Sequence, residues 1–212
     1  MNFDKTNLLL YAVTDRSWLN GATLYDQVEA ALKGGATFVQ LREKELAESS
    51  YREEAGRIRD LCRSWRVPFV INDNVELAAE LDADGVHVGQ SDLEAEAARR
   101  ILGPDKIIGV SVKTVEQALK AQAAGAAYLG VGAVFPTQSK QDADSITRDA
   151  LTGITRAVEI PVVAIGGIQE HNIMELTGCG VHGVAVISAL FAQPDIRLAT
   201  QRLKALVEQI VK

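Results

Sequence analysis

The chain has 212 residues, a formal net charge of −6, and a composition of 47% hydrophobic and 24% charged residues. These values are typical of a soluble globular protein, and the length fits one domain over residues 1–212. The net negative charge argues against nucleic-acid binding, which depends on a positively charged surface. Residues 1–7 lack a signal-peptide pattern and no apolar run could span a membrane, which predicts a cytoplasmic protein without membrane contact.

Apolar runs alternate with amphipathic segments along the whole chain. The apolar runs predict eight strands, at residues 8–13, 37–41, 69–71, 85–88, 107–110, 128–131, 162–165 and 183–187. The amphipathic segments predict helices at residues 23–33, 49–65, 75–81, 93–102, from 114 onward, 148–158 and 195–211.

The predicted strands are short and continuously apolar rather than alternating. Strands of this kind are buried on both faces, as in a parallel sheet that is covered by helices. Eight strand–helix units in a chain of 212 residues predict an α/β fold, a single (β/α)8 TIM barrel with parallel strands. A doubly wound open sheet is the alternative, but no Gly-x-Gly-x-x-Gly turn follows the first strand.

In such a barrel the reactive groups lie at the carboxyl ends of the strands. These positions carry Thr14 and Asp15; Gln40, Arg42 and Lys44; Asn72 and Asp73; Gln90, Ser91 and Asp92; Ser111; residues 137–140; Gly166 and Gly167; and Ser188. Because side chains alternate along a strand, we expect Gln40, Arg42 and Lys44 on one side. Two cations there favour an anion site, unless they form ion pairs with Glu43 or Glu45.

The loop after the sixth predicted strand carries two hydroxyl groups and a cation within four residues, at Thr137, Ser139 and Lys140. These groups suit a phosphorylated ligand, although a solvated surface loop can have the same composition. The backbone at Gly166-Gly167 and the hydroxyl group of Ser188 follow the seventh and eighth strands, where barrels of this kind bind phosphate. The sequence therefore predicts a second anion site at these loops.

Asp73 and Asp92 follow neighbouring predicted strands and could together hold one Mg²⁺ ion through oxygen ligands. Each has a structural alternative as the N-cap of the next helix. His87 lies inside a predicted strand, where a hydrogen-bonded core residue is the more common role, and His171 and His182 are not at strand ends. Since no histidine is well placed as a base, these residues favour displacement of a diphosphate over proton abstraction.

The strand-end segments form a specific set in their order along the chain. They are Tyr11-Ala-Val-Thr-Asp15, Gln40-Leu-Arg-Glu-Lys44, Asn72-Asp73, Asp84-Gly-Val-His-Val-Gly-Gln90 with Asp92, Gly109-Val-Ser111, Gly130-Val-Gly-Ala-Val-Phe-Pro-Thr137 with Lys140, Ala164-Ile-Gly-Gly-Ile168 and Gly183-Val-Ala-Val-Ile-Ser188. Over the whole chain, this set resembles the thiamine phosphate synthase family.

The resemblance implies a transferase that condenses 4-amino-2-methyl-5-hydroxymethylpyrimidine diphosphate with 4-methyl-5-(2-phosphoethyl)thiazole, giving thiamine phosphate and pyrophosphate. It implies that the pyrimidine diphosphate is bound by Gln40, Leu41, Arg42, Glu43, Lys44, Asn72, Ser111 and Lys140, with catalytic roles for Arg42, Lys44, Ser111 and Lys140. It assigns the thiazole phosphate to Thr137, Gln138, Ser139, Gly167, Ile187 and Ser188, and one Mg²⁺ ion to Asp73 and Asp92. In this family the diphosphate leaves to give a pyrimidine-methyl cation, which the thiazole nitrogen captures.

The chain departs from the family pattern at one position, where the usual Thr-x-Thr-Lys is Thr137-Gln-Ser139-Lys140. A thiazole tautomerase of the same fold is the main alternative, but that subfamily carries histidine where this chain has Lys113. A non-catalytic sensor of thiamine phosphate would not need the metal pair and the cations, and a generic sugar-phosphate enzyme would need a visible base. The exposed helical faces show no distinctive apolar stripe, so the sequence favours neither a homo-oligomer nor a monomer.

Overall fold

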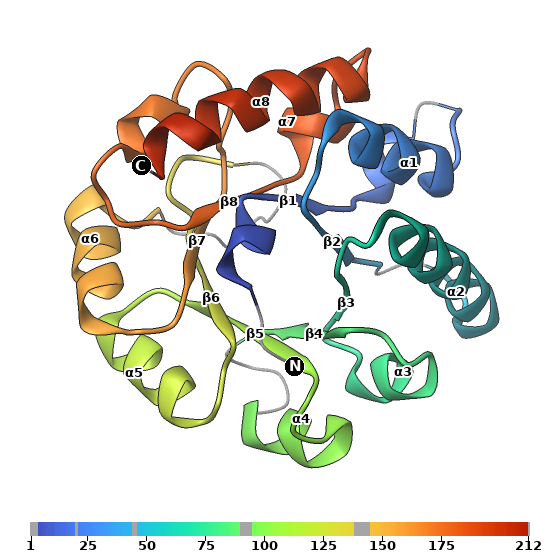
Figure 1. The fold of residues 1–212 in the computed structure, drawn as a ribbon, viewed down its shortest axis with the longest axis horizontal. Coiled ribbons are helices and arrows are strands. Elements are labelled where there is room, and N and C mark those ends of the chain that lie inside the picture. Colours follow the sequence, from blue (N-terminus) through green and yellow to red (C-terminus); the bar gives the residue numbers. More distant parts are fainter. Residues whose placement is uncertain (1–3, 20, 44–45, 90–94, 138–144, 212) are drawn as a thin grey trace.

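The computed structural model describes residues 4–19, 21–43, 46–89, 95–137 and 145–211. Eight parallel strands form a closed barrel, in which each strand pairs with the next one along the chain and β8 pairs with β1 (Figure 1). The strands are β1 Leu10–Val13, β2 Phe38–Leu41, β3 Phe69–Asn72, β4 Gly85–Val88, β5 Ile107–Val112, β6 Tyr128–Val131, β7 Val162–Ile165 and β8 Gly183–Val186. The predicted TIM barrel with parallel strands is confirmed.

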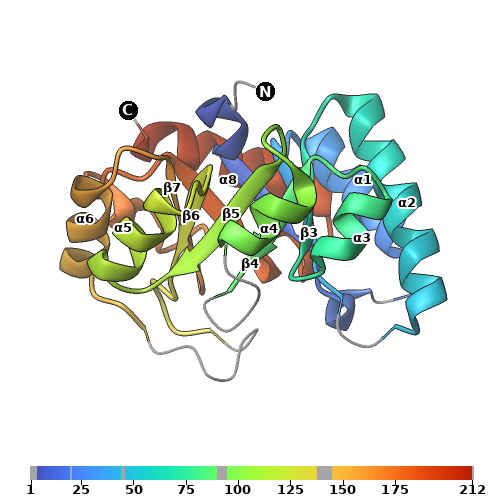
Figure 2. The ribbon, with the colours of Figure 1, turned by 90° about the horizontal axis from the view of Figure 1, so that it is seen from below.

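Helices surround the barrel as an outer ring (Figure 1). The α-helices are α1 Leu24–Gly34, α2 Glu48–Trp65, α3 Val75–Glu80, α4 Ala95–Leu102, α5 Val115–Ala123, α6 Arg148–Ala157, α7 Ser188–Phe191 and α8 Ile196–Ile210, and the 3₁₀ helices are η1 Lys5–Leu8, η2 Arg16–Trp18 and η3 Ile173–Leu176. Figure 2 shows η1 at the end of the barrel where the strands begin. Within the described ranges, no helix combines the length and the apolar character that crossing a membrane requires.

Side chains of the strands alternate between two buried layers. In β2, Val39 packs between the sheet and the helices, whereas Phe38 belongs to a cluster inside the barrel. Inside the barrel, Phe38, Tyr11 and Tyr128 contact one another edge to face, with ring centroids 4.6, 5.7 and 5.9 Å apart. A Cβ atom on Gly109 would lie 2.2 Å from Cζ of Tyr128, so this glycine makes room for the tyrosine ring. The barrel interior is thus a filled core.

Two local predictions differ from the structure, and one α-helix was not predicted. The strand β1 begins at Leu10 rather than at residue 8, because residues 5–8 form η1, which Asp4 caps by accepting from a backbone N–H. The strand β5 extends to Val112, so Ser111 lies within a strand and not after it. The helix α7 was not predicted, because its four residues are too few to give a periodic pattern.

Candidate active site

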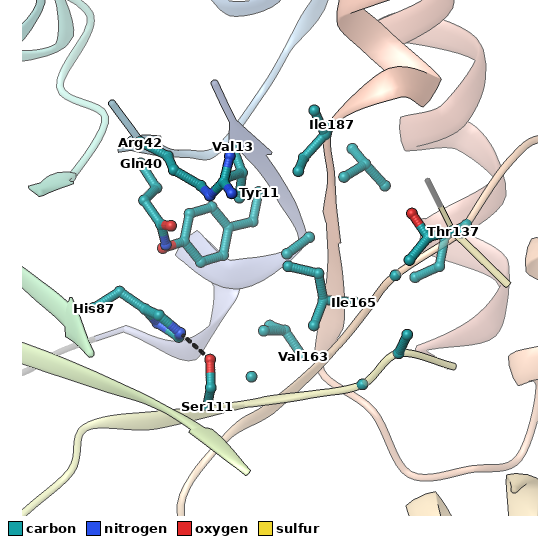
Figure 3. A pocket seen from close by; sticks show the side chains of 18 of the residues that line it. Tyr11, Val13, Gln40, Arg42, His87, Ser111, Thr137, Val163, Ile165 and Ile187 are labelled. Carbon is teal, nitrogen blue, oxygen red and sulfur yellow. Dashed lines mark hydrogen bonds between the residues drawn. The ribbon is translucent and has the colours of Figure 1, made fainter. Parts of the chain in front are cut away.

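A cavity of about 530 Å³ lies at the carboxyl end of the barrel, and residues of all eight strands line it. One side, which we call the polar side, consists of side chains from β2 to β5 and the turn after β2: Gln40, Arg42, Asn72, His87 and Ser111. The opposite side, which we call the aliphatic side, comes from β7, β8 and the turns after them: Val163, Ile165, Gly166, Gly167 and Ile187. Figure 3 shows the labelled members of the two sides facing each other.

Arg42 follows β2 directly, and residues that follow β1 determine its position. Its backbone N–H donates to the hydroxyl group of Thr14 over 3.0 Å, and Thr14 is fully buried. Its guanidinium Nη1 lies 3.3 Å from the carboxylate of Asp15. The ion pair that the structure gives Arg42 is therefore with Asp15, whereas Lys44 and Glu45, the other residues of the predicted alternative, lie outside the described ranges. Arg42 lines the cavity, while the two residues that follow β1 hold its backbone and its side chain.

Glu43 lies beside the cavity, but its carboxylate pairs with Arg16, which does not line the cavity. Arg16 Nε donates to its carboxylate over 2.6 Å, and Arg16 Nη2 donates to Glu54 on α2. The Glu43 side chain is only 3% exposed, so the three residues tie η2, the turn after β2 and α2 together. Burial raises the pKa of Glu54 above its ordinary value, and the nearby Arg16 opposes that shift. Leu41, also predicted to bind substrate, directs its side chain into the layer between the sheet and the helices.

Asp73 follows β3 in a left-handed backbone conformation, with φ of 62°. Its carboxylate accepts from Nδ2 of Asn72 over 2.6 Å, and its backbone N–H donates to the carbonyl group of His87 over 2.9 Å. The N-cap of α3 is Asn74, which accepts from the N–H of Leu77. The alternative role of Asp73 as a helix N-cap is therefore wrong. A non-glycine residue in this conformation carries backbone strain of about 1 kcal/mol, which is most often tolerated at functional positions.

A chain of hydrogen bonds crosses the floor of the cavity. Gln40 Nε2 donates to the hydroxyl group of Tyr11 over 2.5 Å, and the hydroxyl groups of Tyr11 and Tyr128 are 2.8 Å apart. His87 Nδ1 lies 2.9 Å from the Tyr128 hydroxyl group, and His87 Nε2 lies 2.9 Å from the hydroxyl group of Ser111 (Figure 3). Burial raises the pKa of both phenols well above its ordinary value, so both keep their protons.

The aliphatic side depends on close backbone packing between the turns after β6 and β7. The N–H of Phe135 donates to the carbonyl group of Gly166 over 3.0 Å. Gly167 has a φ of +65°, and a Cβ atom there would lie 2.3 Å from the carbonyl oxygen of Pro136. The hydroxyl group of Ser188, at the start of α7, accepts from Nε2 of Gln169 over 3.0 Å. Only glycine fits at position 167, because both its backbone conformation and its neighbour exclude a side chain.

The structure brings to one cavity most of the predicted site residues that lie within the described ranges. Those that line it are Gln40, Arg42, Asn72, Ser111, Thr137, Gly167, Ile187 and Ser188. Five predicted residues lie outside the described ranges: Lys44, Asp92, Gln138, Ser139 and Lys140. Of the predicted metal pair, the described residues include Asp73 alone, and they contain no group of three acidic, histidine or cysteine side chains that could hold a metal ion.

Sequence reasoning missed the part of the site that lies below the strand ends. His87 is the hydrogen-bonded core residue that we expected, yet it also lines the cavity at 8% exposure. Tyr11 lines the cavity as well, and Gln169 reaches Ser188. The signal for Tyr11 and His87 was available, because alternation places them on the inner face of their strands. Both residues were missed because only the carboxyl ends of the predicted strands were expected to carry the site.

Comparisons with known proteins agree with these features. Residues 10–190 match a family model described as TMP-TENI, thiamine monophosphate synthase. The chain is 47% identical to a thiamine-phosphate synthase of Clostridium tetani over 92% of this chain and 93% of that protein. It is 43% identical to one of Persephonella marina, over 97% of this chain and 98% of that one.

A solved structure titled thiamine phosphate pyrophosphorylase, from Pyrococcus furiosus, superposes with a TM-score of 0.90 at 41% identity, over 98% of this chain and 99% of that one. A structure titled KGPDC, from Streptococcus mutans, superposes with a TM-score of 0.67 at 16% identity, which shows the shared fold alone. The chain is an enzyme, a transferase that forms thiamine phosphate. It belongs to the thiamine monophosphate synthase family.

Proposed function

We propose that the cavity binds the pyrimidine diphosphate against its polar side and the thiazole phosphate against its aliphatic side, and that Mg²⁺ assists the departure of the diphosphate. The observation that carries this proposal is the division of one cavity between cationic and hydrogen-bonding side chains on one side and aliphatic groups with backbone amides on the other. The partners are these small molecules, without nucleic acid or membrane, and the compartment is the cytoplasm.

On the polar side, Arg42, Asn72 and Ser111 contact the diphosphate, because a guanidinium, a carboxamide and a hydroxyl group can all donate to its oxygens. Lys44 and Lys140, outside the described ranges, add two further cations. Negative charge grows on the leaving diphosphate as its bond breaks, so fixed positive charge lowers the barrier. Arg42 suits this role since Thr14 and Asp15 hold it before the substrate arrives.

Asp73 fits a role as a ligand of Mg²⁺ together with Asp92. Its carboxylate is exposed, lies at the end of β3 and does not cap the following helix. Asn72, which lines the cavity, donates to one of its oxygens, so the carboxylate is oriented beside the polar side. Oxygen ligands of this kind are those that Mg²⁺ prefers. When bound, Mg²⁺ supplies positive charge to the diphosphate oxygens.

The pyrimidine ring lies toward the floor of the cavity, beside Gln40. Because Nε2 of Gln40 donates to Tyr11, the carbonyl oxygen of its carboxamide can accept from the amino group of the pyrimidine. Leu41, whose side chain points away, contributes only through its backbone, and Glu43 acts by holding the turn that carries Arg42. The aliphatic residues opposite keep water from the reacting carbon.

The thiazole phosphate lies against Thr137, Gly167 and Ser188, with Ile187 beside the ring and with Gln138 and Ser139 outside the described ranges. The bond between the pyrimidine methylene carbon and the diphosphate oxygen breaks, and its electron pair leaves with pyrophosphate. The lone pair of the thiazole nitrogen then forms the new carbon–nitrogen bond. No proton is transferred, so the reaction needs proximity and charge stabilisation rather than a base.

A coupled assay tests the proposal. Purified protein is mixed with both substrates and Mg²⁺, and pyrophosphate and thiamine phosphate are measured with and without EDTA. Equal, metal-dependent amounts of the two products are expected. Rearrangement of a thiazole carboxylate phosphate without pyrophosphate release would support the tautomerase instead. Tight binding of thiamine phosphate without turnover would support the sensor.

A further inference from the structure

The turn after β7 is held by the side chain of Asn172. Its Nδ2 donates to the carbonyl group of Gly167 over 2.9 Å, and its Oδ1 accepts from the backbone N–H of Gln169 over 2.8 Å. Asn172 is half-buried and does not line the cavity, whereas Gly167 does. Asn172 therefore binds this turn from outside the cavity.

Asn172 stands at the N-cap of η3, a position where an asparagine side chain ordinarily accepts from a backbone N–H of the helix that follows. Here the side chain makes no such bond. The orientation of its carboxamide is unambiguous, because both partners are backbone groups: a carbonyl group only accepts, and an N–H group only donates. The side chain thus serves the turn that precedes the helix rather than the helix itself.

A fixed carbonyl group also fixes the N–H group of the same peptide unit. In a planar trans peptide the C=O and N–H bonds point in opposite directions, so the N–H of Ile168 points away from Asn172. The preceding peptide unit is held similarly, since the carbonyl group of Gly166 accepts from Phe135, which does not line the cavity. The N–H of that unit belongs to Gly167. Among the described residues, neither of these two N–H groups has an acceptor.

The glycines in this turn make an external anchor necessary. Gly166 and Gly167 have φ of 100° and 65°, and glycine adopts positive and negative φ about equally well. The turn therefore has few conformational restraints of its own. A shift that directed the Gly167 carbonyl oxygen at a phosphate group would be repulsive, since both only accept hydrogen bonds. Asn172 Nδ2 opposes that shift by holding the carbonyl group.

We infer that Asn172 is a positioning residue that keeps the N–H groups of Gly167 and Ile168 directed into the cavity, toward the phosphate group of the thiazole substrate. It holds the Gly167 carbonyl group away from that phosphate and does not contact the phosphate itself. The side chain of Ile168 is buried, so this residue takes part through its backbone. The inference rests on the proposed function, which places the thiazole phosphate against Thr137, Gly167 and Ser188.

Two ligands that differ by one phosphate group test this role. They are the thiazole phosphate and the same thiazole with a free hydroxyl group, and calorimetry without the pyrimidine substrate gives the affinity for each. Asn172→Ala should lower the affinity for the thiazole phosphate about three- to tenfold, the effect of about one hydrogen bond. It should leave the affinity for the alcohol unchanged. An equal loss for both ligands, or no loss for either, would overturn the inference.

Thr23→Ala is the matched control. Thr23 is the N-cap of α1, accepts from the N–H of Asp26 and does not line the cavity. Its replacement should lower thermal stability, as loss of a cap does, and leave both affinities unchanged. A loss of thiazole phosphate affinity in this variant would show that reduced stability alone explains the result for Asn172→Ala, which would contradict the inference.

Asn172→Asp is the second variant, for the case in which Asn172→Ala folds poorly. Aspartate keeps the acceptor for the N–H of Gln169 and loses only the donor to Gly167. Because the added negative charge also weakens phosphate binding, the decisive measurement for this variant is the response of the two amide groups at saturating ligand.

NMR spectra of ¹⁵N-labelled protein follow these amide groups directly, with inorganic phosphate as the probe. Saturating phosphate should move the amide proton resonances of Gly167 and Ile168 downfield in the unmodified protein, and less in both variants of Asn172. Unmoved resonances in the unmodified protein, or equal movement in all three proteins, would overturn the inference whatever the activity. The expected movements in a protein that makes no thiamine phosphate would support the direction of the amides and contradict the proposed function alone.

Discussion

The two sides of the cavity are built in different ways. The polar side uses side chains that are fixed by partners in neighbouring turns, as Arg42 is by Thr14 and Asp15. The aliphatic side uses backbone packed on backbone, as at Gly167 against Pro136. Charge must be placed accurately to stabilise a leaving group, and hydrogen-bonded side chains achieve that. A neutral heterocycle with a phosphate needs mainly shape and amide donors, and closely packed turns supply both.

The largest expected effect concerns Asp73, the proposed Mg²⁺ ligand beside the polar side. Asp73→Asn keeps the shape of the side chain and tolerates the left-handed backbone, but it removes the charge of the proposed Mg²⁺ ligand. We expect kcat/KM to fall about 100- to 1000-fold, with a raised Mg²⁺ requirement and little change in thermal stability. Steady-state kinetics over a Mg²⁺ series and a thermal melt measure this.

Asp82→Asn is the matched control, because Asp82 also has a left-handed backbone, with φ of 49°, and lies at an exposed surface position bound to Arg63 and Lys106. This variant should retain normal activity. Equal losses in the two variants would indicate that the backbone conformation, and not the metal, explains the effect.

Gly167→Ala tests the aliphatic side. The new Cβ atom would lie 2.3 Å from the carbonyl oxygen of Pro136, so the turns after β6 and β7 must separate. We expect the KM for the thiazole phosphate to rise about tenfold or more, and the free energy of unfolding to fall by about 2 kcal/mol. Gly103→Ala has the same left-handed strain, with nothing within 4 Å of the new atom. It should cost about 1 kcal/mol and leave KM unchanged. A matching rise in the KM for the pyrimidine diphosphate would remove the distinction between the two sides.

A smaller effect is expected when the support of the polar side is removed. Arg16→Met leaves the nearly buried Glu43 carboxylate without this partner and loosens the turn that carries Arg42. We expect the KM for the pyrimidine diphosphate to rise about three- to tenfold, and stability to fall by about 1–3 kcal/mol. Arg52→Met, which breaks more exposed ion pairs with Glu48 and Glu80, should change neither by much. An unchanged KM in Arg16→Met would show that Arg42 does not need this support.

The smallest effect concerns a histidine at the amino end of β8, at the end of the barrel opposite the cavity. His182 precedes β8, where burial lowers its pKa and the nearby Lys5 ammonium adds to the shift. As pH falls below about 6.5, the unfolded chain takes up a proton that folded His182 resists. The free energy of unfolding therefore decreases with falling pH through the window between the two pKa values.

Melting temperatures between about pH 7.5 and 5.5 measure this, since that interval contains the ordinary pKa of histidine. His182→Asn should lose less stability over the interval than the unmodified protein does, whereas a variant at the exposed His171 should follow the unmodified protein. Identical slopes in all three would exclude His182 as the source.

The sequence was sufficient for the barrel because continuous apolar runs of fixed spacing report a local property, burial on both faces. It was sufficient to place Arg42 and Ser111 at one cavity, because the carboxyl ends of the strands converge in this fold. It could not reveal that Arg42 pairs with Asp15, because that partner comes from a neighbouring strand and depends on the register of β1 and β2. The polar chain from Gln40 to Ser111 was missed for the same reason, since its members come from five strands that only the closed barrel brings together.

The left-handed backbone at Asp73 also bears on how this protein can change over generations. Glycine, asparagine and aspartate are the residues that tolerate this conformation best. A single base substitution converts an aspartate codon into a codon for either of the other two. Such a replacement would discard the proposed metal ligand while the chain still folds. A single mutation would thus suffice to give a folded protein that binds the two substrates without joining them.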